Sequence, residues 1–254
     1  MMSELSKKAK VWNEDFKVRA YEVHNDGYAN MATICNYLQE AAGNHASKLG
    51  LAIDHMEEHN WTWVLSRLKV KMVRHPRWRE IITVKTWPSL FDRAYTFRDF
   101  EIYDSNNEMI GSASSMWVVI SLENRRPVRI PELIAGISLP DRKRALEINV
   151  RDRIPNLQNV DFERPFSVRY GDLDMNQHVN NVIYIEWGIE AAPEEWLNHH
   201  FIREIDITFR AECLNGETVL SQAQKTDENS QSMMHRLIRK SDNKILALMK
   251  SSWE

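Results

Sequence analysis

The sequence predicts an α+β chain built from two copies of one unit, each a long helix wrapped by an antiparallel sheet. The first observation is a repeat: FKVRAYEVHNDGYANMATICNYLQEAA from Phe16 aligns without a gap with FSVRYGDLDMNQHVNNVIYIEWGIEAA from Phe166, at an offset of 150 residues. The second is that alternating apolar and polar residues, which indicate half-buried strands, follow this stretch in both halves. The repeat divides the chain into units at 1–130 and 156–254, joined by a charged linker at 131–155.

Each unit is expected to contain one main helix that begins after an asparagine. Asn30 and Asn180 occupy the same position of the repeat and precede apolar-periodic runs. Asparagine suits this place because its side chain accepts a hydrogen bond from a free amide of the first helical turn. The first helix should run to about Lys48 and stop at Gly50, since glycine readily adopts the left-handed conformation at a helix end.

The strands that follow are expected to form hairpins. LKVKMVRHPRWREIITVKT from Leu68 parallels IDITFRAECLNGETVLSQA from Ile205, and Glu80 matches Glu217. In each stretch apolar and polar residues alternate, a small polar cluster follows, and the alternation then resumes. This pattern is typical of a hairpin. Later segments of the two halves, MIGSASSMW and ILALMKSSW, also match. Each unit is therefore expected to consist of a strand, a helix and about four further strands.

Composition excludes several classes of protein. The net charge of -3 argues against a general nucleic-acid binder. No apolar run is long enough for a membrane-spanning helix, and the start MMSELSKKAKVW has no signal-peptide core. The two cysteines, Cys35 and Cys213, fit a reducing compartment, so we expect a cytoplasmic protein. Nine tryptophans indicate large apolar faces, packed on themselves or on an apolar ligand.

The two halves differ where chemistry could occur. The second half has Asp174, Asn176 and His178 at alternating positions, whereas the first has Asp26 in place of Asn176 and Tyr28 in place of His178. In an extended segment the side chains of Asp174, Asn176 and His178 would lie on the same side. This segment would come just before a helix N-terminus, whose free amides favour negative charge. A carboxylate, an amide and an imidazole there suit hydrolysis of an activated carbonyl. The alternative is that they are loop and cap residues.

A second candidate is Glu212-Cys213, which aligns with the region of His75 in the first half. Strand alternation would point Glu212 and Cys213 in opposite directions, so at most one should face the site. Glu212 could act as a general base or orient His178. Cys213 could be a nucleophile paired with His178, or simply a small buried apolar side chain.

One motif is expected to be a coincidence. His55 and His59 fit the H-x-x-E-H pattern of some zinc peptidases, but they lie in a short polar stretch. We expect a solvated loop or helix end there and no metal. No glycine-rich phosphate loop occurs, so nucleotide binding has no support.

Three stretches resemble the acyl-acyl-carrier-protein (acyl-ACP) thioesterases of bacteria and their plant relatives. They are WVLSRLKVKMVRHPRWREIITVKTW, MIGSASSMWVVISLENRRPVRIP and VRYGDLDMNQHVNNVIYIEW, and the resemblance extends over nearly the whole chain. The family's N-x-H-V-N-N-x-x-Y-x-x-W core and its R-x-E-C element are present as Asn176, His178, Val179, Asn180, Asn181, Tyr184, Trp187, Arg210, Glu212 and Cys213.

This resemblance implies two fused hotdog units without a metal or cofactor. It implies hydrolysis of a fatty acyl thioester on the phosphopantetheine arm of acyl carrier protein (ACP), which releases free fatty acid and ends fatty-acid synthesis. The family's catalytic set maps onto Asp174, Asn176, His178 and Glu212. A papain-like alternative would instead use Asn176, His178 and Cys213.

We favour attack by water over attack by the cysteine. On this hypothesis Glu212, helped by His178, activates the water, and Asn176 holds the thioester carbonyl or the water. Asp174 anchors the cluster and fixes His178. Backbone amides near Val179 would stabilise the oxyanion.

The resemblance also assigns the first unit to the acyl chain and predicts a basic surface for an acidic carrier protein. The expected acyl-chain contacts are Met31, Ile34, Leu38, Trp61, Trp63 and Val179. The expected docking cations are Arg125, Arg126, Arg142, Lys143 and Arg144, with Arg74, Arg77, Arg79 and Arg129 as further candidates. Rival functions are an acyl-CoA thioesterase, a non-catalytic acyl-binding module and a dehydratase of the same fold. A homodimer of such chains is left open.

Overall fold

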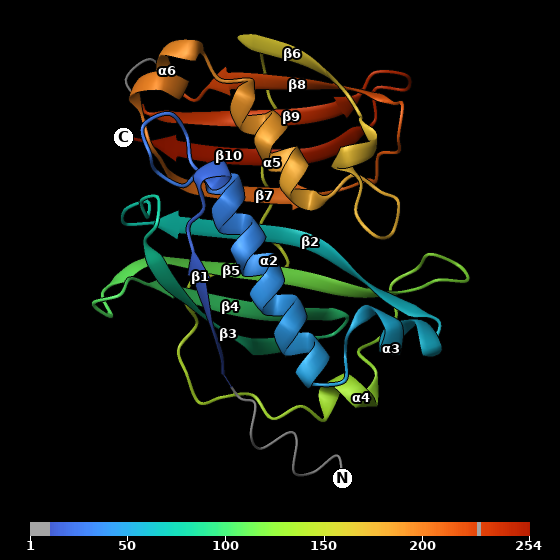
Figure 1. Ribbon diagram of the computed structural model, residues 1–254. Helices are drawn as coiled ribbons and strands as arrows, with labels where there is room; N and C mark the ends of the chain where they lie inside the picture. Colours follow the sequence, from blue (N-terminus) through green and yellow to red (C-terminus); the bar gives the residue numbers. More distant parts are fainter. Residues whose placement is uncertain (1–10, 228–229) are drawn as a thin grey trace. The chain divides into compact units, whose positions relative to one another are not determined.

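The structure is a computed structural model that describes residues 11–227 and 230–254 (Figure 1). The start of the chain, where no signal peptide is expected, lies outside the described residues except for its last two positions. The chain divides into two compact units: unit 1 comprises residues 1–66 and 72–150, and unit 2 comprises residues 67–71 and 151–254.

Unit 1 contains one long helix and five strands. In Figure 1 helix α2 runs across one face of the antiparallel sheet, whose strand order is β1-β3-β4-β5-β2. The elements are β1 (Trp12–Lys17), the 3-10 turn η1 (Ala20–Glu22), α2 (Met31–Lys48), α3 (Ile53–Glu58), β2 (Trp61–Met72), β3 (Ile81–Asp92), β4 (Tyr95–Tyr103), β5 (Met109–Ser121) and α4 (Glu132–Ala135).

Unit 2 repeats this arrangement with a shorter helix. Helix α5 runs across its sheet, in which the strand order is β6-β8-β9-β10-β7 (Figure 1). The elements are β6 (Phe162–Ser167), the 3-10 turn η2 (Tyr170–Asp172), α5 (Asn181–Glu190), α6 (Glu194–His199), β7 (Ile202–Phe209), β8 (Thr218–Lys225), β9 (Ser232–Arg239) and β10 (Ile245–Trp253).

The common strand order confirms the predicted α+β repeat and corrects the predicted hairpins. In each unit the first strand pairs with the third, and the second strand lies beside the last, so β2 is not paired with β3, nor β7 with β8. The hairpin prediction was wrong because alternation at every second residue specifies which face of a strand is buried. It does not specify the neighbouring strand.

Helix α2 begins and ends as its sequence predicts. The Asn30 side chain accepts a hydrogen bond from the amide of Thr33 at 2.7 Å, and the last helical residue is Lys48. Gly50 follows with a left-handed φ of 71°. In unit 2 the side chain of Asn180 caps α5 by accepting from the amide of Val182 at 3.0 Å.

Part of the expected linker is bound to unit 1 instead of spanning free. Asp99 on β4 is fully buried and accepts the amide of Ala145 at 2.9 Å. The guanidinium of Arg144 lies 3.4 Å from Asp99, and that of Arg142 lies 4.3 Å from the ring centroid of buried Trp87. These ionic and cation–π contacts hold a segment without regular structure against the sheet.

The interior of unit 2 contains a buried imidazole. His235 on β9 is fully buried, and its Nε2 lies 2.7 Å from the hydroxyl oxygen of Ser251 on β10. The same hydroxyl accepts the indole N–H of Trp253 at 2.8 Å. Burial lowers the pKa of His235 to about 3 because the charged imidazolium would lose its hydration.

Candidate active site

A closed turn before α5 holds the polar motif of unit 2. Arg169 precedes the 3-10 turn η2, and both its backbone amide and its guanidinium donate to the carboxylate of Asp172, each at 2.8 Å. The Asp172 side chain is 2% exposed, whereas that of Arg169 is 76% exposed, so the carboxylate is buried under a guanidinium that faces water. Beyond it, Leu173 and Val179 pair as an isolated antiparallel bridge that closes the turn.

The carboxylate of Asp174 organises the inside of this turn. Its Oδ1 accepts the amide of Asn176 at 2.8 Å and that of His178 at 3.3 Å. Gln177 adopts a left-handed φ of 61°, and its counterpart in unit 1 is Gly27, with a φ of 80°. The prediction of an extended segment was therefore wrong, because an aspartate that binds its own following amides forms a turn. Asp174 fixes His178 through the backbone.

The turn brings His178 to Glu212. The Nε2 atom of His178 lies 3.3 Å from Oε2 of Glu212, and the two side chains are 28% and 46% exposed, so both groups remain accessible to a substrate or to water. Asn176 is exposed on the same turn, and its side-chain amide makes no hydrogen bond within the described residues. The structure thus places a carboxylate, an imidazole and an unbound carboxamide within one small surface region.

Cys213 has a different environment from its neighbour Glu212. Both lie between β7 and β8 in a segment without regular structure, yet Glu212 is exposed and Cys213 is fully buried, so the predicted opposite orientation holds without a strand. Burial, followed by the nearby carboxylate of Glu217, raises the pKa of the Cys213 thiol to about 12. At neutral pH the sulfur is protonated and hidden from substrate.

One amide at the start of α5 remains open. The amide of Val179 donates to the carbonyl of Cys213 at 3.1 Å, and the amide of Val182 is occupied by the Asn180 cap. The amides of Val179 and Val182 are therefore already used, and the expected oxyanion contact from amides near Val179 stays a prediction for a neighbouring residue. Between residues 176 and 183 only the amide of Asn181 donates no hydrogen bond, so it is the N–H at this helix N-terminus that is left to bind an anion.

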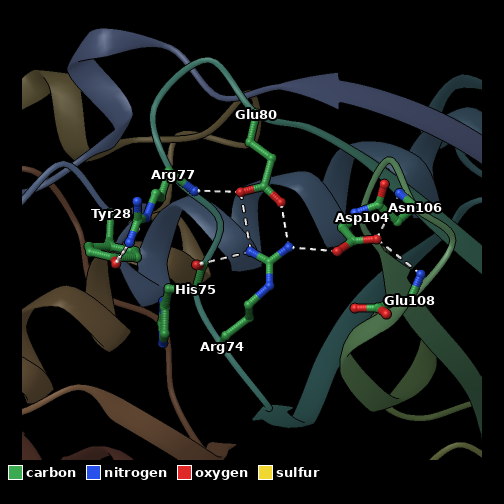
Figure 2. Close-up of polar contacts among 8 residues, drawn as sticks. All are labelled: Tyr28, Arg74, His75, Arg77, Glu80, Asp104, Asn106 and Glu108. Atoms are coloured by element: carbon green, nitrogen blue, oxygen red, sulfur yellow. Dashed lines mark hydrogen bonds and ion pairs between the residues drawn. The ribbon is translucent and has the colours of Figure 1, made fainter.

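The corresponding place in unit 1 has lost this chemistry. Tyr28 replaces His178, and its hydroxyl accepts from Nη2 of Arg77 at 2.6 Å (Figure 2). His75, which replaces Glu212, is buried with its Nδ1 2.8 Å from the carbonyl oxygen of Ala29. No carboxylate–imidazole pair forms at this position, so the candidate chemistry belongs to unit 2.

Comparison with known proteins identifies the family. Residues 9–137 match the family described as the acyl-ACP thioesterase N-terminal domain, and residues 156–254 match the acyl-ACP thioesterase C-terminal domain. The chain belongs to the acyl-ACP thioesterase family. This confirms the resemblance seen in the sequence and the assignment of two hotdog units.

Individual relatives agree. The chain is 31% identical to the chloroplastic oleoyl-acyl carrier protein thioesterase 2 of Arabidopsis thaliana over 82% of its own length and 61% of the relative's, so it spans about three fifths of that protein. A crystal structure of an acyl-ACP thioesterase from Bacteroides thetaiotaomicron is 27% identical with a TM-score of 0.86, covering 96% of this chain and 98% of that one. The 12:0-ACP thioesterase from Umbellularia californica has the same fold, with 24% identity, a TM-score of 0.86, and coverage of 96% and 97%.

Within this family fold, the expected acyl-chain residues lie in three places. Met31, Ile34 and Leu38 are buried on α2. Trp61 and Trp63 on β2 are half-buried against a cluster of Leu51, Met56, Val119 and Ile134. Val179 is buried at the end of the turn formed by residues 173–179 in unit 2, which we call the catalytic turn for its candidate role.

Some of the expected docking cations form ion pairs within unit 1. Arg142 forms an ion pair of 2.6 Å with Glu101, and Arg144 is bound by Asp99, so both help to attach the linker. Arg74 likewise pairs with two carboxylates, those of Glu80 and Asp104, so its charge is neutralised within unit 1 (Figure 2). Arg125, Arg126, Arg129 and Lys143 are exposed.

Two sequence expectations concern metals and membranes. His55 lies on the short helix α3 and contacts Asp54 at 3.1 Å, and the described residues contain no group of three or more metal-ligating side chains. In the described part of the chain, no helix is long and apolar enough to cross a membrane.

Sequence reasoning missed three residues that shape the site: Asp172, Glu217 and Arg239. Arg239 on β9 donates from Nη2 to the backbone carbonyl of Glu212 at 2.9 Å. The repeat held part of the signal, because Glu217 matches Glu80 and the Arg169 that binds Asp172 matches Arg19. Arg239 has no such signal, since the arginine in the corresponding contacts of unit 1 comes from another position in the chain.

Proposed function

We propose that this protein hydrolyses the thioester of a fatty acyl chain carried by ACP and releases free fatty acid and holo-ACP. The observation that carries the proposal is the contact of 3.3 Å between His178 and Glu212, in a chain that matches both domains of the acyl-ACP thioesterase family. The amide of Asn181, three residues after His178 in the chain, donates no hydrogen bond, and on this proposal it stabilises the charge of the tetrahedral intermediate.

The proposed reaction is direct attack by water. Glu212, with His178 as its partner, removes a proton from a water molecule while that water adds to the thioester carbonyl carbon. The Asn181 amide and the carboxamide of Asn176 hold the oxygen that becomes negative. The C–S bond then breaks, the carbonyl reforms as a carboxylic acid, and the proton held by the pair passes to the leaving sulfur to give the thiol.

The environment of Cys213 supports water as the nucleophile. A cysteine nucleophile must be an accessible thiolate, whereas Cys213 is fully buried and its pKa is raised to about 12. We expect Cys213→Ala to keep most of the turnover and Glu212→Gln to lose about 100-fold or more. Complete loss of turnover in a folded Cys213→Ala variant would overturn the water mechanism.

We further propose that unit 1 holds the acyl chain against α2 and the half-buried Trp61 and Trp63. Exposed Arg125, Arg126 and Lys143 are the cations proposed to meet an acidic carrier. Both cysteines are buried and unpaired, which supports a reducing, cytoplasmic location. The homodimer suggested by the sequence stays a prediction.

The deciding experiment is a panel of acyl thioesters of several chain lengths, each supplied both on ACP and on coenzyme A, with free fatty acid as the measured product. Faster turnover on ACP at every length supports the proposal. Equal or faster turnover on coenzyme A would indicate an acyl-CoA thioesterase instead. If neither carrier gave product, the rival function of a non-catalytic acyl-binding module would be favoured. Raised salt should weaken ACP binding if the exposed cations contact it.

A further inference from the structure

The segment that carries Glu212 needs support from outside itself. It connects β7 to β8 without regular secondary structure, so its own backbone ladder does not fix the position of Glu212. One contact comes from the catalytic turn, where the amide of Val179 donates to the carbonyl of Cys213. The carbonyl of Glu212 itself is bound by Nη2 of Arg239 at 2.9 Å, from the end of strand β9.

Glu217 completes this support at the far end of the segment. Its Oε2 accepts the amide of Leu214 at 2.7 Å, and its Oε1 lies 3.4 Å from Nη1 of Arg239. Although burial opposes it, the Leu214 amide, the Cys213 thiol and Arg239 together lower the pKa of Glu217, so the carboxylate is ionised at neutral pH. Arg239 therefore bridges the carbonyl of Glu212 and the carboxylate of Glu217.

Unit 1 builds the same bridge with a different arginine (Figure 2). Glu80, the counterpart of Glu217, accepts the amide of Arg77 at 2.9 Å and binds Nη2 of Arg74 at 2.6 Å. The same guanidinium reaches the carbonyl of His75, the counterpart of Glu212, at 3.5 Å, and it binds Asp104 at 2.8 Å.

The origin of the arginine distinguishes the two bridges. Position 74 of unit 1 corresponds to Ala211 in unit 2, so the catalytic unit has no arginine there. It uses Arg239 from β9 instead. Two copies of one fold thus retain a guanidinium between the same carbonyl and the same glutamate although the chain supplies it from different places. This recurrence is the observation from which we assign the guanidinium a role in holding the shape of the segment.

We infer that Arg239, held by Glu217, is a positioning residue that fixes the Glu212 segment so that the Glu212 carboxylate meets His178. This inference rests on the proposed hydrolase function. Without Arg239 the Glu212 carbonyl loses its donor and the Glu217 carboxylate loses its cation, and the segment shifts. A displacement of about 1 Å in a catalytic group is enough to reduce turnover by about 100-fold.

The first test compares Arg239→Gln with the matched control Arg74→Gln, which breaks the same bridge in the unit without the catalytic pair. We expect Arg239→Gln to lower kcat by about 100-fold with KM within about twofold, and Arg74→Gln to leave kcat within about twofold. Arg239→Lys keeps the charge but cannot bind both the Glu212 carbonyl and the Glu217 carboxylate. Its kcat should therefore lie between those of wild type and Arg239→Gln. Equal kcat for wild type and Arg239→Gln, or equal losses in both glutamine variants, would overturn the inference.

The second test does not depend on activity. In a Cys35→Ala chain the only thiol is the fully buried Cys213, next to Glu212. Its reaction rate with dithiodipyridine under native conditions should rise at least tenfold in Arg239→Gln and stay unchanged in Arg74→Gln. An unchanged rate in Arg239→Gln would contradict the positioning role. If wild type hydrolyses no acyl-ACP, the proposed function fails, while this labelling still reports on the bridge.

Discussion

Acidification should destabilise unit 2 through one buried imidazole. His235 has a pKa of about 3 in the folded protein because it is fully buried, whereas an unfolded histidine binds its proton near pH 6.5. Between these values the unfolded chain binds more protons than the folded one. Stability is therefore complete above pH 6.5 and is lost as the pH falls through 6.5 towards 3.

The two pKa values fix the size of the effect. For one such group, linkage gives a loss of about 2 kcal/mol between pH 7 and pH 5, and about 3 kcal/mol by pH 4. Small domains are stable by only about 5–15 kcal/mol, so the loss from this single side chain is a substantial fraction of the stability of a domain of this kind.

Urea unfolding at pH 7 and pH 5 measures this loss. The control is His235→Gln, which can still bond to Ser251 but cannot titrate, while all other histidines contribute equally to both proteins. Between pH 7 and pH 5 the free energy of unfolding of wild type should fall by about 2 kcal/mol more than that of the variant. Equal losses would refute the reasoning, as would an NMR titration in which the His235 imidazole of the folded protein takes up its proton near pH 6.5.

Three substitutions test local features of unit 1, each by urea unfolding against wild type. Asn30→Ala removes the side chain that accepts the Thr33 amide and should cost about 1 kcal/mol; an unchanged midpoint would mean that the cap contributes nothing. Gly43→Ala, at an exposed helical position with nothing within 4 Å of the added Cβ, should stabilise by about 0.5–1 kcal/mol. Gly111→Ala places a Cβ 2.6 Å from the sulfur of Met72 and should cost about 1–3 kcal/mol, so a neutral result would show that this core yields easily.

The elements of the fold were predictable because their signals are local. Asn30 and Asn180 mark helix starts through bonds to amides two or three residues away, and Gly50 marks a helix end through its own φ. Strand partners were not predictable in this way. The pairing of β2 with β5 and of β3 with β1 depends on how the sheet wraps the helix, which period-2 alternation does not encode.

In the candidate site, too, local features could be predicted from the sequence and contacts between distant residues could not. The divergence of His178 from Tyr28 pointed to unit 2, and Glu212 and Cys213 do face opposite ways. The sequence could not show which amide near Val179 stays free, because the acceptor of the Val179 amide, the Cys213 carbonyl, is 34 residues away in the chain. Arg239 could not be predicted for a related reason. The residues around it in the sequence do not indicate that its guanidinium binds the carbonyl of Glu212 on another segment.

Backbone strain separates the catalytic turn from its copy. Gln177 carries a Cβ at a φ of 61°, where the same turn of unit 1 has Gly27. A side chain in this left-handed region costs about 1 kcal/mol that glycine avoids. The turn that presents His178 is therefore held at higher energy by its surroundings, while unit 1 contains the relaxed form of the same turn. At this turn, the copy that carries His178 is the one under more backbone strain.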